Sequence, residues 1–368
     1  MPPSVESDAG QSRRQACRDA RLCRLVVSAG EPSGRLYAAL VETAVARAAP
    51  AAVIHRFDAG RACGAVFGFV EGLRAAPALR RSLAETARAV AELRPDLVLL
   101  VGFSGYHLAL GRRCRRLGLP VAFFAPPQLW AWGGWRAGAL RRAADLVICL
   151  FGFEAKWLRA RGIPAEFAGN PLADLARPAA GRAETLSRLG LAPADRYLAF
   201  LPGSRPAERD WHRPVFDRVE TPGRHRVWLL PDEPGDPAAL LAAAAGRYDA
   251  LAHADAAVVV SGTATLETAL LGTPQVACYH LSPATRLLAR LLVRSRRFAL
   301  PNILLGRPSV PELLEPTPAA IGRELAALLA DPARQARARQ DARELRALLG
   351  PPGAAEHIAR LLLDRAGL

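Results

Sequence analysis

Short apolar runs alternate with helix-compatible segments along most of the chain. Continuous runs such as Leu97–Val101 are typical of strands that are buried on both faces of a parallel sheet. The expected strands are Leu22–Ser28, Ala52–Arg56, Leu97–Gly102, Val121–Phe124, Leu146–Leu150, Glu166–Phe167, Tyr197–Leu201, Arg226–Leu230, Ala256–Val260 and Gln275–Tyr279. The expected helices include Ser33–Arg47, Arg80–Leu93, Gly138–Ala144, Glu154–Arg161 and Thr263–Leu271.

This strand–helix alternation occurs twice, so the pattern predicts an α/β protein with two doubly wound, Rossmann-like domains. Proline, alanine and aspartate cluster between residues 172 and 195, which places the break there. We expect a disordered tail over residues 1–20, an N-terminal domain over 21–175, a C-terminal domain over 190–340 and a terminal helix over 341–368. Ligands of such sheets bind at the carboxyl ends of strands, so the loops after strands are the candidate sites.

Composition narrows the class of protein. No apolar run reaches 18 residues without an arginine or glycine, and residues 1–20 lack the apolar core of a signal peptide, so we expect a cytoplasmic chain without a membrane span. The six cysteines show neither a C-x-x-C pair nor metal-ligand spacing, which indicates reduced thiols and no metal site.

The chain is strongly basic, with a formal net charge of +15, and Lys156 is its only lysine. GC-rich codon usage and contact with anions both explain such an arginine excess, and the sequence leaves the two open. An anionic membrane surface or a phosphorylated substrate would suit the charge. Nucleic acid is not expected, because the chain shows no nucleic-acid motif and no aromatic residues interleaved with basic ones.

Two loops of the first half carry candidate chemistry. "SAGEPSGRLYAAL" is a glycine-bearing turn that contains Gly30, Glu31 and Ser33, although it matches neither G-x-G-x-x-G nor a P-loop. An ordinary tight turn with Ser33 as helix N-cap is the alternative. "APPQLWAWGGWRAGALRR" holds Trp130 and Trp132, which could contact a sugar ring, an acyl chain or a lipid headgroup, or could simply pack the loop.

Two strand-to-helix turns of the second half predict an anion site. "YLAFLPGSRPAERD" breaks an apolar run at Pro202-Gly203, and "VVVSGTATLETALLGTP" breaks another at Ser261-Gly262. Backbone N–H groups at helix N-termini favour anions, so the pair is expected to hold a nucleotide diphosphate. The candidates are Gly203, Ser204 and Arg205 in the first turn, and Ser261, Gly262, Thr263 and Glu267 in the second, where the glutamate would accept hydrogen bonds from ribose hydroxyls.

"ALPNILLGRPSVPELLE" supplies one further candidate. Asn302 lies between Pro301 and an apolar run, where its amide has little structural need, so we interpret it as a functional residue, with a structural role as the alternative.

Taken in order, these segments and "VFGFVEGL" at residues 66–73 resemble the lipid-A-disaccharide synthase family, inverting glycosyltransferases of the GT-B fold. The resemblance implies two Rossmann-like domains that face a cleft, with the C-terminal helix returning to the N-terminal domain. It implies that the N-terminal domain takes diacylglucosamine 1-phosphate and the C-terminal domain UDP-diacylglucosamine. The acceptor's primary hydroxyl would attack the anomeric carbon of the donor, forming a β-1,6 disaccharide of lipid A and releasing UDP.

The resemblance also assigns residues. Arg205 corresponds to the family arginine beside the donor diphosphate, Ser261, Thr263 and Glu267 to its donor loop, and Asn302 to the asparagine of its "LPN" segment. The tryptophan loop and the basic surface would face acyl chains and the inner membrane, to which the protein would be peripheral. No metal or cofactor is implied, and the oligomeric state stays open, a homodimer included.

Three positions depart from the family pattern. The family's aspartate-containing loop is missing, since residues 97–144 hold no aspartate or glutamate. His107 is the remaining titratable candidate for a general base, and a structural or solvent-exposed histidine is the alternative. Arg35 stands where the family commonly has aspartate, and the interval from Arg205 to Asp255 is about one strand–helix unit short. A transferase for another UDP-sugar or lipid acceptor, and a catalytically silent binding protein, therefore remain alternatives.

Overall fold

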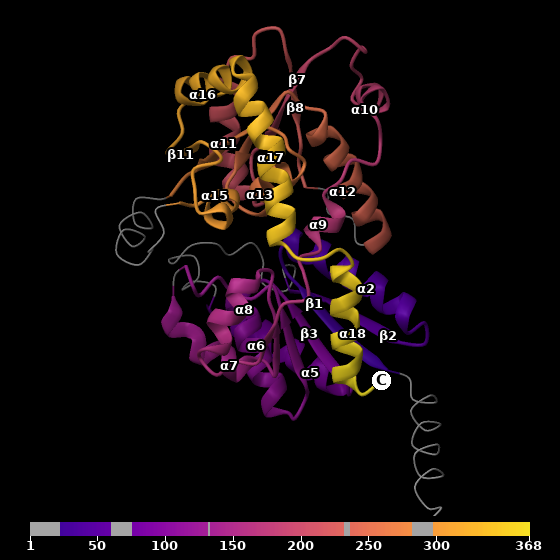
Figure 1. Ribbon diagram of the computed structural model, residues 1–368. Coiled ribbons are helices and arrows are strands. Elements are labelled where there is room, and N and C mark those ends of the chain that lie inside the picture. Colours follow the sequence, from indigo (N-terminus) through magenta and orange to yellow (C-terminus); the bar gives the residue numbers. More distant parts are fainter. Residues whose placement is uncertain (1–22, 60–75, 132, 232–235, 282–296) are drawn as a thin grey trace, which may run out of the picture.

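The computed structural model describes residues 23–59, 76–131, 133–231, 236–281 and 297–368. The expected tail over 1–20, the "VFGFVEGL" segment and Trp132 lie outside the described residues. Two lobes are stacked end to end, each built on a parallel sheet (Figure 1).

The N-terminal sheet has six parallel strands in the order β2-β1-β3-β4-β5-β6. Their bounds are β1 Arg24–Ala29, β2 Val53–Asp58, β3 Leu97–Val101, β4 Val121–Phe124, β5 Leu146–Ile148 and β6 Ala165–Glu166. The helices of this lobe are α2 Pro32–Ala48, α5 Ala76–Glu92, α6 Ser104–Arg116, the 3-10 turn η1 Gly134–Arg136, α7 Ala137–Ala143 and α8 Gly152–Arg159. Strand β3 is buried at every position, as its unbroken apolar run requires.

The C-terminal sheet has five parallel strands in the order β11-β10-β9-β7-β8. Their bounds are β7 Tyr197–Leu201, β8 His225–Trp228, β9 Ala256–Val260, β10 Gln275–Tyr279 and β11 Glu312–Leu314. The remaining helices are α9 Leu172–Leu175, α10 Arg182–Arg188, α11 Pro206–Asp217, α12 Pro237–Ala252, α13 Thr263–Leu270, α15 Leu300–Leu305, α16 Pro318–Ala330, α17 Pro332–Leu348 and α18 Ala354–Ala366.

The last helix returns to the first lobe. α17 runs along the C-terminal lobe, and α18 packs against α2 of the N-terminal lobe (Figure 1). The chain therefore crosses between the lobes twice, near Asn170 and near Leu349, and the two crossings are hydrogen-bonded to each other. The N–H of Asn170 donates to the Leu349 carbonyl at 2.9 Å, and Asp174 Oδ2 accepts from the N–H groups of Gly353 and Ala354 at 2.9 and 3.1 Å.

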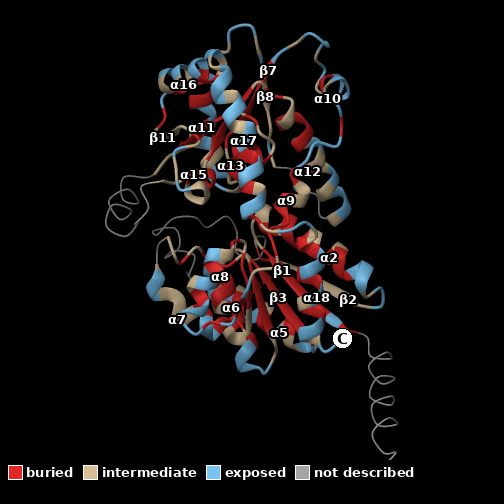
Figure 2. Ribbon diagram, viewed as in Figure 1, coloured by how far each residue is buried: buried red, intermediate tan, exposed pale blue. Residues whose placement is uncertain are grey.

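Burial follows the two sheets and the helix faces that cover them, as the red strands of the lower lobe show (Figure 2). One continuous core extends from β1 and α2, through α18, to α12 and α13 of the other lobe. The α/β prediction is confirmed, and four strands, among them Val121–Phe124 and Ala256–Val260, have the predicted bounds. Strand β11, which the sequence analysis did not predict, adds a parallel edge next to β10.

Candidate functional site

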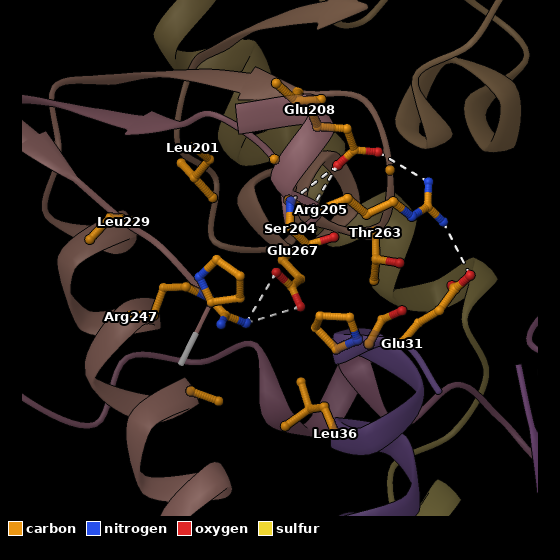
Figure 3. A pocket seen from close by; sticks show the side chains of 18 of the residues that line it. Glu31, Leu36, Leu201, Ser204, Arg205, Glu208, Leu229, Arg247, Thr263 and Glu267 are labelled. Atoms are coloured by element: carbon orange, nitrogen blue, oxygen red, sulfur yellow. Dashed lines mark hydrogen bonds and ion pairs between the residues drawn. The ribbon is translucent and has the colours of Figure 1, made fainter. Parts of the chain in front are cut away.

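A pocket lies between the lobes, where the N-terminus of α2 faces the carboxyl ends of β7 and β9 (Figure 3). It brings together most of the residues that the sequence analysis selected. Those lining it are Glu31, Ser33, Gly203, Ser204, Arg205, Ser261, Gly262, Thr263 and Glu267. Gly30, His107, Trp130 and Asn302 do not line it.

Arg205 connects the two lobes at this pocket. Its Nη2 donates to Glu31 Oε1 at 3.1 Å, and its Nη1 donates to Glu208 Oε1 at 3.1 Å (Figure 3). Burial opposes the charge of Arg205, but the two carboxylates outweigh it and raise the pKa of the guanidinium. A fixed cation therefore stands at the junction of the domains, with one carboxylate from each.

Glu208 occupies the N–H groups that the sequence analysis assigned to an anion. Its Oε2 accepts from the backbone N–H of Ser204 at 3.1 Å and of Arg205 at 3.2 Å, and Arg205 and Glu208 together form a capping box. Gly203 has φ +110°, and a Cβ there would lie 2.6 Å from the Cβ of Glu208, so only glycine fits. Because its own glutamate takes these N–H groups in the structure, their use by a ligand would require Glu208 to move and stays a prediction.

The second turn keeps its helix end open. α13 begins at Thr263 as predicted, but its N-cap is Gly262, and among the described residues no side chain caps it. Ser261 does not cap the helix either, because its Oγ donates to the Phe298 carbonyl at 3.0 Å. The first turn of α13 thus presents its N–H end and partial positive charge to the pocket that Thr263 and Ala264 line.

Glu267 is one turn further along α13 and is buried with 4% exposure. Its Oε1 accepts from the Tyr248 hydroxyl at 3.0 Å, and Arg247 Nη2 lies 3.4 and 3.5 Å from the two oxygens. The carboxylate is thus at the pocket wall with two donors from α12, which suits the predicted hydrogen bonds to a ribose.

His107 is not placed as a general base. It is fully buried, its Nδ1 donates to the Gly102 carbonyl at 2.7 Å, and its Nε2 accepts from Ser28 Oγ at 3.0 Å. The rings of Phe103, Tyr106 and Phe123 surround it. The prediction is corrected accordingly: an enclosed imidazole with both nitrogens bonded ties β1 to the turn after β3 and does not meet a bound hydroxyl.

Burial lowers the pKa of His107 from 6.5 to about 4, although the Gly102 carbonyl opposes this. The unfolded chain binds this proton first as the pH falls, so stability is present above pH 6.5 and is lost towards pH 4. We expect His107 to remove about 2 kcal/mol from the free energy of unfolding between pH 7 and pH 5. Urea unfolding of the wild type and of His107→Gln at both pH values measures this, and the same pH dependence in both proteins would contradict it.

Asn302 has a structural task, which is the alternative that its sequence position left open. With 1% exposure, its Nδ2 donates to the Val310 carbonyl at 2.8 Å, and its Oδ1 accepts from the N–H groups of Ser309 and Val310 at 2.7 and 2.8 Å. The amide therefore closes the loop between α15 and β11. The expectation that the amide has little structural need was therefore wrong. A catalytic role for Asn302 stays a prediction, and Asn302 does not line the pocket.

Trp130 is anchored within the N-terminal lobe. Its Nε1 donates to Glu154 Oε1 at 3.2 Å, and its ring meets that of Phe153 edge to face at 4.9 Å. Burial raises the pKa of Glu154 to about 8, with the Trp130 and backbone hydrogen bonds opposing it. Gly30 packs closely against the ring of Phe103, because a Cβ on Gly30 would lie 2.6 Å from that ring. For Trp130 the packing alternative accounts for the observed contacts, whereas in the turn that contains Gly30 the N-cap of α2 is Glu31 and not Ser33.

Glu208 and Arg247 are the charged residues of the pocket that sequence reasoning missed. Glu208 stands at the third helical position after Arg205, the place of the acidic partner in a capping box, and that spacing could have identified it. Arg247 is a single cation in the alanine-rich α12, a pattern with no specific meaning. The described residues contain no group of three or more His, Cys, Asp or Glu side chains that could hold a metal ion. None of their helices is both long and apolar enough to span a membrane.

Comparison with known proteins settles the family. A profile of lipid-A-disaccharide synthetase matches residues 62–357. The lipid-A-disaccharide synthase of Syntrophus aciditrophicus is 33% identical over 370 residues, covering 92% of this chain and 97% of its own. The chain belongs to the lipid-A-disaccharide synthase family. A second lipid-A-disaccharide synthase, from Anaeromyxobacter dehalogenans strain 2CP-1, is 36% identical over 376 residues, covering 92% of this chain and 97% of its own.

Solved structures agree on the fold. The UDP-GlcNAc 2-epimerase of Neisseria meningitidis, bound to UDP-GlcNAc, aligns with a TM-score of 0.60 at 12% identity, covering 93% of this chain and all of the other. The S. aureus MnaA–UDP structure aligns with a TM-score of 0.60 at 11% identity, covering 92% and 95%. This likeness shows the GT-B arrangement of two Rossmann-like domains, and membership of the lipid-A-disaccharide synthase family supports a glycosyltransferase that forms the lipid A disaccharide.

Proposed function

We propose that the protein transfers a diacylglucosamine unit from UDP-diacylglucosamine to diacylglucosamine 1-phosphate, forming a β-1,6 disaccharide and releasing UDP. The observation that carries the proposal is the pocket at the domain junction, where Arg205, the open end of α13 and Glu267 stand together. A cation, a helix N-terminus and an acceptor carboxylate match the diphosphate and the ribose of a nucleotide-sugar.

Arg205 and α13 would act on the leaving group. Negative charge develops on the diphosphate as the glycosidic bond to UDP breaks, and fixed positive charge next to it lowers the barrier. Because Arg205 is paired with Glu31 and Glu208, a bound diphosphate would compete for the guanidinium.

Glu31 is our candidate for the general base in place of His107. It lies at the N-cap of α2 in the acceptor-side domain and lines the pocket opposite the donor turns. When the donor takes over Arg205, the Glu31 carboxylate becomes available to accept the proton of the acceptor's primary hydroxyl. Residues 97–144 contain no aspartate or glutamate that could serve instead. Among the described residues that line the pocket, Glu31 is the carboxylate contributed by the N-terminal lobe.

A peripheral position at the cytoplasmic face of the inner membrane belongs to the same proposal. Trp135 is 81% exposed and Phe153 is 42% exposed in the N-terminal lobe. Exposed aromatic side chains on a chain with net charge +15 suit contact with anionic lipid, from which the acylated substrates would be taken.

The test is UDP release from UDP-diacylglucosamine in detergent without added metal, with and without diacylglucosamine 1-phosphate. We expect release that depends on the acceptor. Glu31→Gln should lower turnover by about 100-fold with donor affinity changed only a few-fold, since general-base catalysis contributes that much. Glu92→Gln, which alters an exposed carboxylate at the end of α5, is the matched control and should leave both unchanged.

The outcomes separate the alternatives. UDP binding without any release would favour the catalytically silent binding protein. Release that needs a different lipid acceptor would identify a divergent transferase. Full activity of Glu31→Gln would remove Glu31 as the base and leave the transferase standing.

A further inference from the structure

Arg247 lies at one end of the pocket, and the sequence pattern gave this residue no role. It is on α12, its side chain is 16% exposed, and its Nη2 reaches both oxygens of Glu267 at 3.4 and 3.5 Å. Figure 3 shows the guanidinium pointing at the carboxylate from across the pocket, on the side away from Arg205. Arginine offers donors only, so Arg247 cannot itself accept a hydrogen bond from a ligand hydroxyl.

Glu267 is held from α12 at two successive positions. Besides Arg247, the hydroxyl of the fully buried Tyr248 donates to Oε1 at 3.0 Å. Burial first, and then the Glu267 charge, raise the pKa of Tyr248 well above its usual value, so it remains a neutral donor. The same two causes raise the pKa of Tyr37 on α2, the helix that packs against α12.

The two ends of the pocket differ in chemistry. Arg205 and the N-terminus of α13 stand at one end, whereas Leu229 stands on the side of Arg247 (Figure 3), and Pro231, Leu240 and Ala243 add to the apolar lining of the pocket. An apolar wall suits the flat face of a nucleobase, and a carboxylate between that wall and the anion end stands where a ribose would lie.

We propose that Arg247 is a positioning residue that fixes Glu267 to accept hydrogen bonds from the ribose hydroxyls of a nucleoside diphosphate, and thereby sets the preference for ribose over 2′-deoxyribose. The inference rests on the proposed function, because it takes a nucleoside diphosphate as the ligand. A buried carboxylate that loses one hydroxyl partner pays for the unsatisfied acceptor, so the deoxy compound is rejected. If the carboxylate is free to turn away, that discrimination is lost.

The experiment is calorimetric titration of the full chain with UDP and with 2′-deoxy-UDP. We expect the wild type to bind UDP about 10-fold to 100-fold more tightly, the range for a hydrogen bond to a charged group. In Arg247→Met the ratio should fall to about 3-fold or less, mainly because UDP binds more weakly. Arg247→Lys, which keeps the charge without the planar fork, should recover only part of the ratio.

The matched control is Arg188→Met. Arg188 pairs with Asp249 on the same α12, Nη1 to Oδ2 at 3.3 Å, but outside the pocket. It should leave the ratio at the wild-type value, so a general loosening of α12 is separated from the loss of Arg247.

Two results would overturn the inference while leaving UDP binding in place. The first is an equal loss of affinity for both nucleotides in Arg247→Met, which would make Arg247 a contact to phosphate and not a support for Glu267. The second is a wild type that does not distinguish the two nucleotides. A wild type that binds no UDP at all would instead contradict the proposed function.

Discussion

Arg205→Ala is expected to lower kcat/KM for UDP release by about 100-fold to 1,000-fold, the usual effect of removing one group that stabilises transition-state charge. Arg205 is the cation of the pocket that touches both lobes, through Glu31 and Glu208. Its removal leaves two carboxylates facing a diphosphate without the guanidinium between them. Donor affinity should therefore fall together with turnover.

Stability should change little in the same variant. Arg205 is 38% exposed and Glu31 is 28% exposed, and ion pairs at that exposure contribute about 1 kcal/mol or less. Kinetic assays and thermal unfolding of the same preparation measure the two effects. Arg218→Ala, at the exposed C-cap of the same helix α11, is the control and should keep full activity. Activity within a few-fold of the wild type in Arg205→Ala would refute the placement of the diphosphate.

Gly111→Ala is expected to destabilise the N-terminal domain by about 3 kcal/mol, at the upper end of what overpacking usually costs. Gly111 is buried where α6 packs on α7, and a Cβ there would lie 2.3 Å from the Ala143 carbonyl oxygen and 3.0 Å from Leu100 Cδ1. The oxygen belongs to the backbone of α7, so relief requires moving a whole helix.

Gly105→Ala provides a matched comparison in the same helix. Its added Cβ would meet nothing within 4 Å, and because Gly105 is the second residue of α6, alanine should raise the stability there by about 0.5 kcal/mol or less. Denaturant unfolding should therefore separate the two glycine variants in opposite directions from the wild type. Equal stability of the two would show that α6 and α7 can move apart without penalty.

Much of the fold could be predicted because local chemistry and tertiary structure agree. Tyr197–Leu201 is apolar throughout and stops at Pro202-Gly203, where a strand cannot continue, so its bounds follow from the sequence. Strand β11 could not be predicted, because Glu312–Leu314 is three residues long and partly exposed, which leaves no periodic signal. The strand forms only by pairing with β10, a tertiary contact that the local sequence does not encode.

The site residues that lie in strand-to-helix turns could be predicted from the sequence, whereas Arg247, which lies within a helix, could not. Gly203, Arg205 and Thr263 are marked by strand-to-helix turns, and they meet because parallel strands bring their carboxyl ends to one edge. His107 failed as a base because the sequence does not show on which side of α6 a polar residue lies, and its side is the one that packs on the sheet. Arg247 reaches Glu267 only through the packing of α12, which no local pattern encodes.

The two bonded crossings between the lobes constrain how the molecule can move. The crossing near Asn170 and the crossing near Leu349 lie side by side, and Asp174 ties the second to the first. The packing of α2 against α12 joins the lobes in addition to these crossings, so the lobes cannot twist or slide freely past each other. A relative movement of the lobes would change the distance between Glu31 and Arg205, which belong to different lobes, while β7 and β9 keep their mutual geometry as neighbours in one sheet. An opening of the lobes would therefore lengthen or break the Glu31–Arg205 ion pair, whose distance reports how far apart the two walls of the pocket stand.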